Sequence, residues 1–219
     1  MLGWFSGRKT EKPMQKELGP LGAVIGGALD LDFLSLEADA LGAQPAMPLP
    51  QSGAFIIAAY GEVRLDAASV LSRYYDENHQ MIQVMSPSGM PGDGIEDISF
   101  YRPWDSVVPV SQSEWSRWTG PSGMIGASTY DADGILFNRF WGEGLERAKT
   151  VQFVEEVEDG ETSRSIHQSC MLYYRPLGTT QEMLLINVER DLDPSQAQAG
   201  RSVEFLIGYG IGAADVRRI

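Results

Sequence analysis

The segment AFIIAAYGEVRLD, residues 54–66, carries the strongest strand pattern at the start of the chain's β-rich part. It combines aromatic and β-branched side chains and contains no proline, so it predicts one or two β-strands. VLSRYYD (70–76) and QMIQVMS (80–86) follow and predict a hairpin around the polar residues 77–79. IEDISFYR (95–102) predicts a further strand.

The same pattern returns in the second half of the chain. TYDADGILFNRFW (129–141) predicts a hairpin that turns at Asp133-Gly134. VQFVEEVEDGETSRSIHQSCMLYYR (151–175) predicts another, turning at Asp159-Gly160, and both dipeptides match the type I′ preference. MLLINVER (183–190) and SVEFLIGY (202–209) then predict two apolar strands.

Helical signals are few. In VSQSEWSRW (110–118), Ser111 followed three residues later by Glu114 indicates a capping box, and Gly120-Pro121 ends the helix. LDLDFLSLEADAL (29–41) fits a strand or a helix. We therefore predict an α+β protein, predominantly antiparallel β, with about ten strands in two sheets or two lobes and few short helices.

The domain organisation follows from glycine and proline content. Residues 1–27 contain six glycines and two prolines and show no sustained period, so they predict a flexible N-terminal tail and linker. Residues 28–219 form the predicted β-rich globular body. Its two halves, 28–125 and 126–219, are an alternative division into lobes.

Charge separates the tail from the body. The chain has a net charge of −13, yet residues 1–17 hold four basic and two acidic side chains. An acidic body repels nucleic acid and anionic lipid, so we expect no nucleic-acid partner. A membrane or partner contact is expected in the tail, through a set of apolar and basic residues: Met1, Leu2, Trp4, Phe5, Arg8 and Lys9.

The N-terminal residues do not show the pattern of a targeting signal. The apolar residues at the start precede the basic ones and are interrupted by glycine and serine, unlike a secretory signal. No apolar run reaches the 18 residues of a spanning helix, and the single cysteine, Cys170, allows no internal disulfide. We expect a cytoplasmic protein whose membrane contact, at the inner membrane, is at most peripheral.

The sequence contains no recognisable metal-binding, catalytic or nucleotide-binding motif. His79, His167 and Cys170 are too few and too scattered for a zinc site, and Cys170 lies in an apolar run typical of a core thiol. The chain contains no G-x-S-x-G, Walker or dinucleotide fingerprint. We therefore assign no catalytic residue, no metal ligand and no cofactor.

A ligand pocket is predicted where aromatic residues surround acids. Trp104 and Asp105 adjoin in YRPWDS, and Trp141 and Glu143 in RFWGEG. An apolar wall raises the pKa of a carboxyl group, and aromatic rings can hold a ligand. Core packing of the rings and an ion pair of Glu143 with a nearby arginine are the alternative interpretations.

Several stretches together resemble a bacterial group, domain-of-unknown-function family 2491. They are GGALDLDFLSL, YYDENHQMIQVM, SEWSRW, RFWGEG, HQSCMLYYR and SVEFLIGYGIGAADVRRI, spread over residues 26–219. Genes of this family typically lie beside genes for a phage-shock-protein-A-like protein, small membrane proteins and an ATP-grasp enzyme. The resemblance implies an accessory part in an envelope-stress or membrane-maintenance system and transfers no functional residue.

Two functional hypotheses follow. The first is a non-catalytic cytoplasmic adaptor that binds another protein, a phage-shock-protein-A-like or small membrane protein, with its tail as a contact. The alternative is a module or enzyme that binds a polyamine or peptide and works with the ATP-grasp ligase. An acidic surface suits a polyamine, because its cations require carboxylates.

Overall fold

The computed structural model describes residues 16–144, 146–193 and 201–219. Its elements are, in chain order, β1 (Ala28–Leu31), α1 (Leu34–Asp39), β2 (Gly53–Ile56), β3 (Ala59–Asp66), β4 (Ser69–Tyr75), β5 (Met81–Ser86), β6 (Asp97–Val107), α2 (Gln112–Thr119), β7 (Thr129–Ala132), β8 (Ile135–Arg139), β9 (Val151–Glu158), β10 (Ser163–Leu177), β11 (Thr180–Asp191), β12 (Arg201–Gly210), a 3-10 helix (Ala213–Asp215) and β13 (Val216–Arg218). The predicted antiparallel β fold with few short helices is confirmed.

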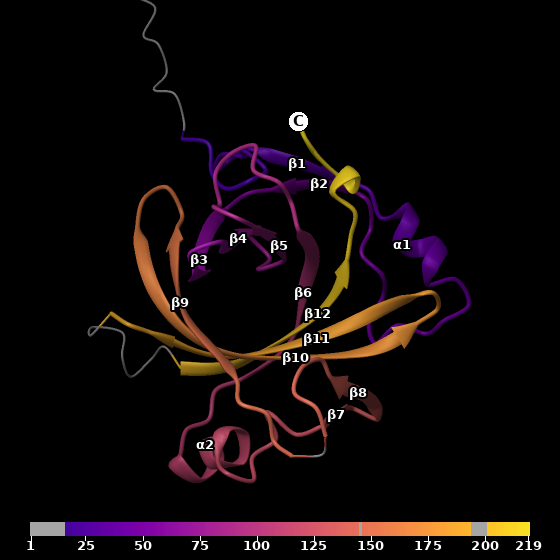
Figure 1. The fold of residues 1–219 in the computed structure, drawn as a ribbon, viewed down its shortest axis with the longest axis vertical. Helices are drawn as coiled ribbons and strands as arrows, with labels where there is room; N and C mark the ends of the chain where they lie inside the picture. Colours follow the sequence, from indigo (N-terminus) through magenta and orange to yellow (C-terminus); the bar gives the residue numbers. More distant parts are fainter. Residues whose placement is uncertain (1–15, 145, 194–200) are drawn as a thin grey trace, which may run out of the picture.

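Eight of the described strands close into one antiparallel barrel (Figure 1). Around the ring they follow the order β3-β4-β5-β6-β12-β11-β10-β9 and return to β3. β10 and β11 pair over their whole shared length, from Ile166–Asp191 to Leu177–Thr180. β3 and β9 pair at only three positions, from Tyr60–Glu158 to Glu62–Glu156. Both halves of the chain therefore contribute strands to the same closed sheet.

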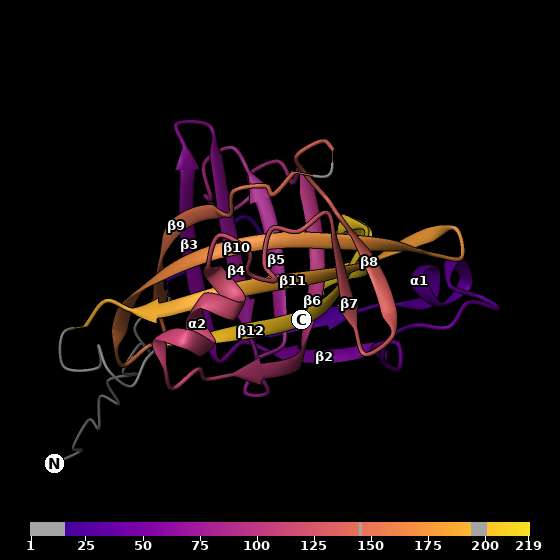
Figure 2. The same cartoon turned by 90° about the horizontal axis from the view of Figure 1, so that it is seen from below.

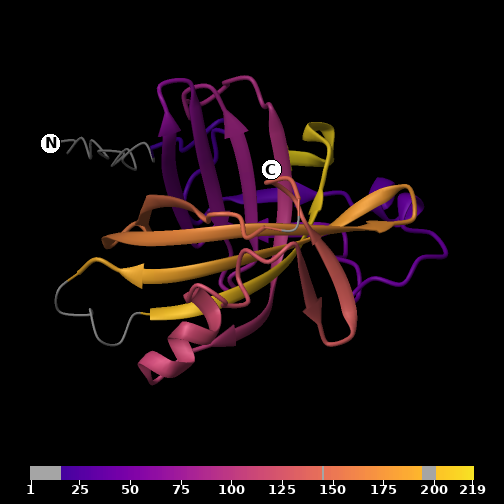
Figure 3. The ribbon, with the colours of Figure 1, turned by 60° about the horizontal axis from the view of Figure 1, so that its bottom comes forward.

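A smaller sheet, in the order β13-β1-β2, covers one side of the barrel (Figure 1). Phe55 of β2 and Phe33, which follows β1, pack against the outer face of β6, where their rings lie 6.4 Å and 5.0 Å from Phe100. On the opposite side, α2 and the β7–β8 hairpin cover β10–β12, whose long strands run across the direction of β3–β6 (Figures 2 and 3). Trp118 and Tyr130 pack there against Phe205, at 5.5 Å and 5.9 Å.

The larger apolar core consequently lies outside the barrel wall. Side chains alternate between the two faces of a strand, so one set of barrel residues packs against these covering elements. The other set points into the barrel and forms a smaller apolar cluster: Met81, Tyr101, Cys170, Leu185 and Leu206. Buried polar residues accompany this inner cluster, which makes the interior chemically distinct from an ordinary core.

The structure settles the two helical segments that the sequence indicated. Residues 29–41, which fit either a strand or a helix, form β1 and then α1. The N-cap of α2 is confirmed, since Ser111 Oγ accepts a hydrogen bond from Glu114 N at 3.2 Å. The reciprocal bond of a capping box is displaced by one residue, because the Glu114 side chain accepts from Val110 N at 2.7 Å.

The turn at Asp133-Gly134 has positive φ at both residues, 52° and 85°, as type I′ requires. The same prediction for Asp159-Gly160 is wrong, because only Gly160 has positive φ there. The Asp159 carboxylate instead accepts hydrogen bonds from the backbone of Glu161 and Thr162, which builds a longer loop.

Part of the predicted tail and linker packs on the body. Leu18 and Ala23 are buried, and Gly26 N donates a hydrogen bond to Ile57 O at 2.7 Å. The ordered body therefore begins before the predicted boundary at residue 28. Among the helices of the described ranges, none combines the length and apolarity needed to cross a bilayer.

Candidate functional site

The barrel cavity, of about 670 Å³, opens at one end of the barrel. That end carries the β4–β5 turn and the β9–β10 turn, and strands from both halves of the chain supply the lining residues. The volume lies within the range of about 300–1,000 Å³ that is typical of small-molecule pockets. We refer to this space as the barrel cavity.

A buried ion pair forms the floor of the barrel cavity. Arg73, on β4, and Glu155, on β9, are 2% and 0% exposed, and Arg73 Nη1 lies 2.9 Å from Glu155 Oε2. Tyr75 Oη donates to Glu155 Oε1 at 2.7 Å, and Gln168 Nε2 donates to Glu155 Oε2 at 2.6 Å. Gln83 accepts from Arg73 Nε at 2.9 Å. The pair is therefore held by a complete hydrogen-bond network, as a buried charge requires.

The network shifts the pKa values of its members. Burial opposes the charged form of Arg73, but the Glu155 carboxylate outweighs it and holds the pKa of Arg73 above its usual value. Burial, with the same carboxylate, raises the pKa of Tyr75. Burial raises the pKa of Cys170 to about 12, so the thiol stays protonated at neutral pH. Cys170 is thus a core thiol in the described structure, as predicted.

Asn187, on β11, is the one buried side chain of the described residues with an unpartnered oxygen or nitrogen. Asn187 is 3% exposed and lines the barrel cavity, yet no group within residues 16–144, 146–193 and 201–219 donates to its Oδ1. An acceptor left in this state costs about 1–3 kcal/mol. A bound molecule with an N–H or O–H donor would remove that cost.

Two carboxylates flank Asn187. Glu204 lies directly opposite it on β12, and Glu189 lies two residues further along the same face of β11. Burial, followed by the charges of Glu155 and Glu204, raises the pKa of Glu189 to about 7. Glu204 accepts one hydrogen bond, from Ser106 Oγ at 2.9 Å. The barrel cavity thus concentrates acceptors that lack a full set of donors.

Two other acids at the mouth accept hydrogen bonds from the backbone of the turns. Asp76 accepts from the backbone of Asn78 and Gln80, at 2.9 Å and 2.8 Å, and Asp159 closes the β9–β10 loop. Of the described residues that line the cavity, Arg164 carries a positive charge, and His79 is counted as neutral at pH 7. The mouth therefore carries net negative charge, which attracts cations and repels anions.

Most polar groups that line the barrel cavity are hydrogen-bond acceptors. Within the described residues no three of the His, Cys, Asp and Glu side chains gather as metal ligands do. The Cys170 thiol of the inner apolar cluster is protonated, and the Glu155 carboxylate is already paired with Arg73. What remains is a set of oxygen acceptors, Asn187, Glu189 and Glu204, that matches an ammonium group.

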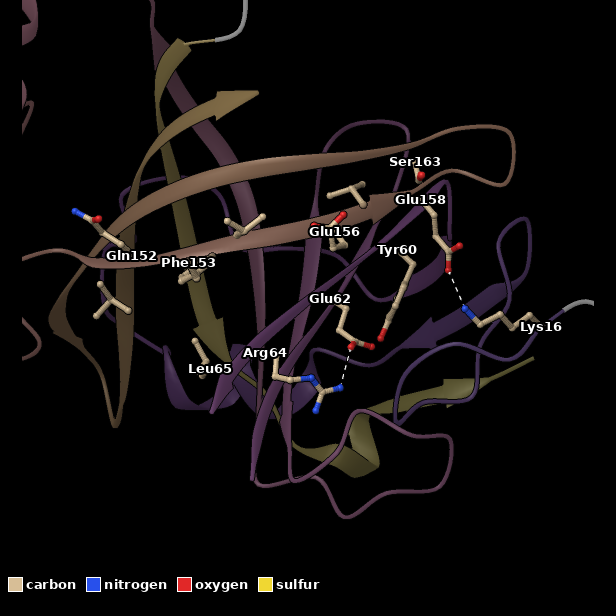
Figure 4. Close-up of a pocket in the computed structure, with 13 residues that line it drawn as sticks. Lys16, Tyr60, Glu62, Arg64, Leu65, Gln152, Phe153, Glu156, Glu158 and Ser163 are labelled. Carbon is tan, nitrogen blue, oxygen red and sulfur yellow. Dashed lines mark hydrogen bonds and ion pairs between the residues drawn. The ribbon is translucent and has the colours of Figure 1, made fainter. Parts of the chain in front are cut away.

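A second hollow, the seam groove, lies where β3 and β9 separate (Figure 4). Its volume is about 880 Å³, and Tyr60, Glu62 and Arg64 line one side of it. Arg64 pairs with Glu62 at 3.3 Å, and Lys16 pairs with Glu158 at 3.5 Å, both visible in Figure 4. These exposed pairs contribute little to stability.

Unpaired strand edges border the seam groove. Pairing between β3 and β9 ends at Glu62–Glu156, although β3 continues to Asp66 and β9 begins at Val151. On their other sides these stretches pair with β4 and β10. In residues 16–144 and 146–193, no strand pairs with the edges that face the groove. Free edges of this kind accept an additional strand.

The predicted contact residues of the tail lie outside the described residues: Met1, Leu2, Trp4, Phe5, Arg8 and Lys9. The four predicted pocket residues do not line the barrel cavity.

Trp104 is half-buried against Phe205, with the rings 6.4 Å apart, and Asp105 beside it is exposed. Trp141 is half-buried and its Nε1 donates to Lys149 O at 3.4 Å, whereas Glu143 is exposed. Both tryptophans pack against the larger core, and their role in a pocket stays a prediction.

Sequence reasoning missed Asn187, Glu189 and Glu204. The signal was present in MLLINVER, where alternate positions change from apolar Met183 and Leu185 to Asn187 and Glu189. A polar half on one face of an apolar strand indicates the point at which that face meets water or a ligand.

The known sequences that match this chain are described as proteins of unknown function. The family model for "Protein of unknown function (DUF2491)" matches residues 3–217. An Escherichia coli (strain K12) protein described as "Uncharacterized protein YjfK" is 28% identical over 181 residues, which cover 80% of this chain and 80% of that protein. No solved structure matches.

Proposed function

The chain belongs to the DUF2491 family of proteins of unknown function, and we propose that it is a binding module that holds a small organic amine in the barrel cavity. The observation that carries this proposal is Asn187, which lines the cavity and whose buried Oδ1 has no donor among the described residues. A protonated amine supplies up to three N–H donors, so one group can satisfy Asn187 and neutralise a carboxylate at the same time.

Charge supports a ligand with more than one amine. Glu189 and Glu204 flank Asn187, and Glu77 lies further out at the mouth. A linear polyamine can place one ammonium group at Asn187 and the next toward the mouth. Hydrogen bonds to charged groups contribute about 1.5–3 kcal/mol each, which corresponds to a tenfold or larger change in affinity.

The test is isothermal titration of the protein with spermidine. We expect saturable heat from the wild type, and at least tenfold weaker binding in Asn187→Leu and in Glu189→Gln. Glu62→Gln is the matched control, because it removes one carboxylate from the outer face of the barrel. Absence of saturable heat in the wild type, or equal binding by all four proteins, would refute the proposal.

The pH dependence gives an independent readout of the same site. Glu189 must be ionised to pair with an ammonium group, and its pKa in the free protein is about 7. We therefore expect the affinity for spermidine to rise with pH up to about 7 and then to level off, while Glu189→Gln shows a flat profile over this range.

A second candidate function is the adaptor role, which the seam groove supports. The edges of β3 and β9 that face the groove can pair with an extended peptide of a partner protein. The family resemblance suggests a phage-shock-protein-A-like or small membrane protein as this partner. A cytoplasmic location with peripheral contact at the inner membrane belongs to the same proposal.

Hydrogen exchange tests the adaptor role directly. A purified phage-shock-protein-A-like protein is added, and we expect slower exchange in residues 63–66 and 151–155. The β4–β5 hairpin is the internal control, because its strands are paired on both sides. Unchanged exchange in both segments would exclude strand addition at the seam groove.

A further inference from the structure

The outer face of β10–β12 holds a basic groove of about 1,110 Å³, bordered by the end of α2 and by the segment that leads into β9. Its lining includes five basic or imidazole side chains: Arg147, Lys149, His167, Arg190 and Arg201. Among the described residues that line it, none is Asp or Glu. This composition is the reverse of the whole chain, which has 30 acidic and 17 basic side chains.

Three of these side chains form a row across neighbouring strands. His167 of β10 lies directly opposite Arg190 of β11, and Arg190 lies directly opposite Arg201 of β12. Directly opposed residues share a face of the sheet, and like charges in this position destabilise it. Within the described ranges, none of the three forms an ion pair with a carboxylate. A bound anion would relieve this repulsion.

The groove also positions its cations. The guanidinium of Arg201 stacks on the ring of Trp115, 4.2 Å from its centroid. Arg147 donates to the carbonyl oxygens of Gly123 and Ile125, which anchor its side chain at the rim. Held in this way, the side chains lose less entropy when they bind, so the site is partly preorganised.

We propose that the basic groove binds the phosphate or diphosphate group of a small molecule. Arginine forks match phosphate oxygens with two parallel hydrogen bonds, and the hydroxyl groups of Thr150 and Ser169 supply further donors in the same lining. The apolar side chains of Ile125 and Val188 offer a surface for the rest of the ligand. A net charge of −13 disfavours the approach of an extended anionic surface, so a compact ligand fits better than a membrane.

This site is independent of the barrel cavity. The row His167, Arg190 and Arg201 lies on the outer face of the sheet, whereas Gln168 and Glu189, one residue away on the same strands, face inward. Loss of amine binding would leave the phosphate proposal standing, and the reverse also holds.

The probe is inorganic pyrophosphate, titrated into the full chain at low and at moderate salt. We expect saturable binding that weakens as salt rises, and at least tenfold weaker binding in the Arg190→Gln/Arg201→Gln double variant. The control double variant is Arg64→Gln/Arg217→Gln, which makes the same charge change at exposed sites elsewhere and should bind within twofold of the wild type.

Vesicles of phosphatidylglycerol form the second arm of the experiment. Saturable binding of pyrophosphate, without co-sedimentation of the protein with vesicles, supports a small-molecule phosphate as the ligand. Co-sedimentation with vesicles, without binding of pyrophosphate, would overturn the proposal in favour of a lipid headgroup. Failure of the wild type to bind pyrophosphate overturns the proposal, as does equal weakening in both double variants. The replaced side chains are exposed, and a thermal melt confirms that each variant is folded.

Discussion

Replacement of Arg73 by methionine tests the polar floor of the barrel. The variant keeps the unbranched stem of the side chain but leaves the buried Glu155 carboxylate without its cation. Gln83 and Gln168 also lose the donor that each now accepts from, at 2.9 Å and 2.7 Å. Tyr75 and Gln168 continue to donate to Glu155, so part of its solvation remains.

The expected loss is about 3–5 kcal/mol in the free energy of unfolding, because removal of one partner leaves a buried charge uncompensated. Domains are stable by only about 5–15 kcal/mol, so the change is a large part of the total. For a chain of 219 residues, about 2–4 °C per kcal/mol places the drop in melting temperature between roughly 6 and 20 °C.

Guanidinium chloride unfolding, followed by circular dichroism, measures this change in a double-mutant cycle. The variants are Arg73→Met, Glu155→Leu and the combination of both. We expect the double variant to be more stable than the sum of the single losses predicts, by about 2 kcal/mol or more, since it removes the charge pair as a unit. A loss below 1 kcal/mol for Arg73→Met, or strict additivity, would show that the pair is not the buried network described above.

Three further perturbations probe other parts of the fold. The pKa of Glu189 is raised by burial to about 7, so the folded state holds a proton that the unfolded state releases between about pH 4.5 and pH 7. The wild type should therefore lose up to about 3 kcal/mol of stability as pH rises through this window, and Glu189→Gln should not; parallel pH profiles of the guanidinium midpoints would contradict this. Gly61→Ala places a Cβ 1.9 Å from Glu155 Oε1 and should lower stability by about 1–3 kcal/mol, whereas Gly94→Ala, with no atom within 4 Å, should have little effect in the same thermal melts. Ser111→Ala removes the N-cap hydrogen bond of α2 and should lower stability by about 1 kcal/mol; an unchanged chemical-denaturation midpoint would argue against the cap.

Local patterns were sufficient for most of the strands and for one of the two predicted type I′ turns. The hairpin predicted from residues 70–76 and 80–86 is β4–β5, and Asp133-Gly134 turns as its dipeptide predicts. Ser111 and Glu114 marked the start of α2. Each of these features depends on residues a few positions apart, and their conformational preferences act without help from the rest of the chain.

The candidate site depends on pairings that no local pattern reveals. Glu62 meets Glu156, and Arg73 meets Glu155, across more than 80 residues of sequence. Alternation showed that each strand has two faces, but it did not show which face would be enclosed. The aromatic neighbours of Asp105 and Glu143 predicted a pocket around these acids, yet both side chains are exposed.

Local sequence patterns are enough to predict the β-rich class, the individual hairpins, the N-cap of α2 and the acidic character of the body. Closure of the strands into a ring depends on the folded chain, because it rests on the long-range pairing of β3 with β9 and of β6 with β12. That closure turns one face of each strand inward. It buries Asn187 beside Glu189 and Glu204, and it aligns Arg190 with Arg201 on the outer face. Sites built from neighbouring strands exist only once the register between those strands is set.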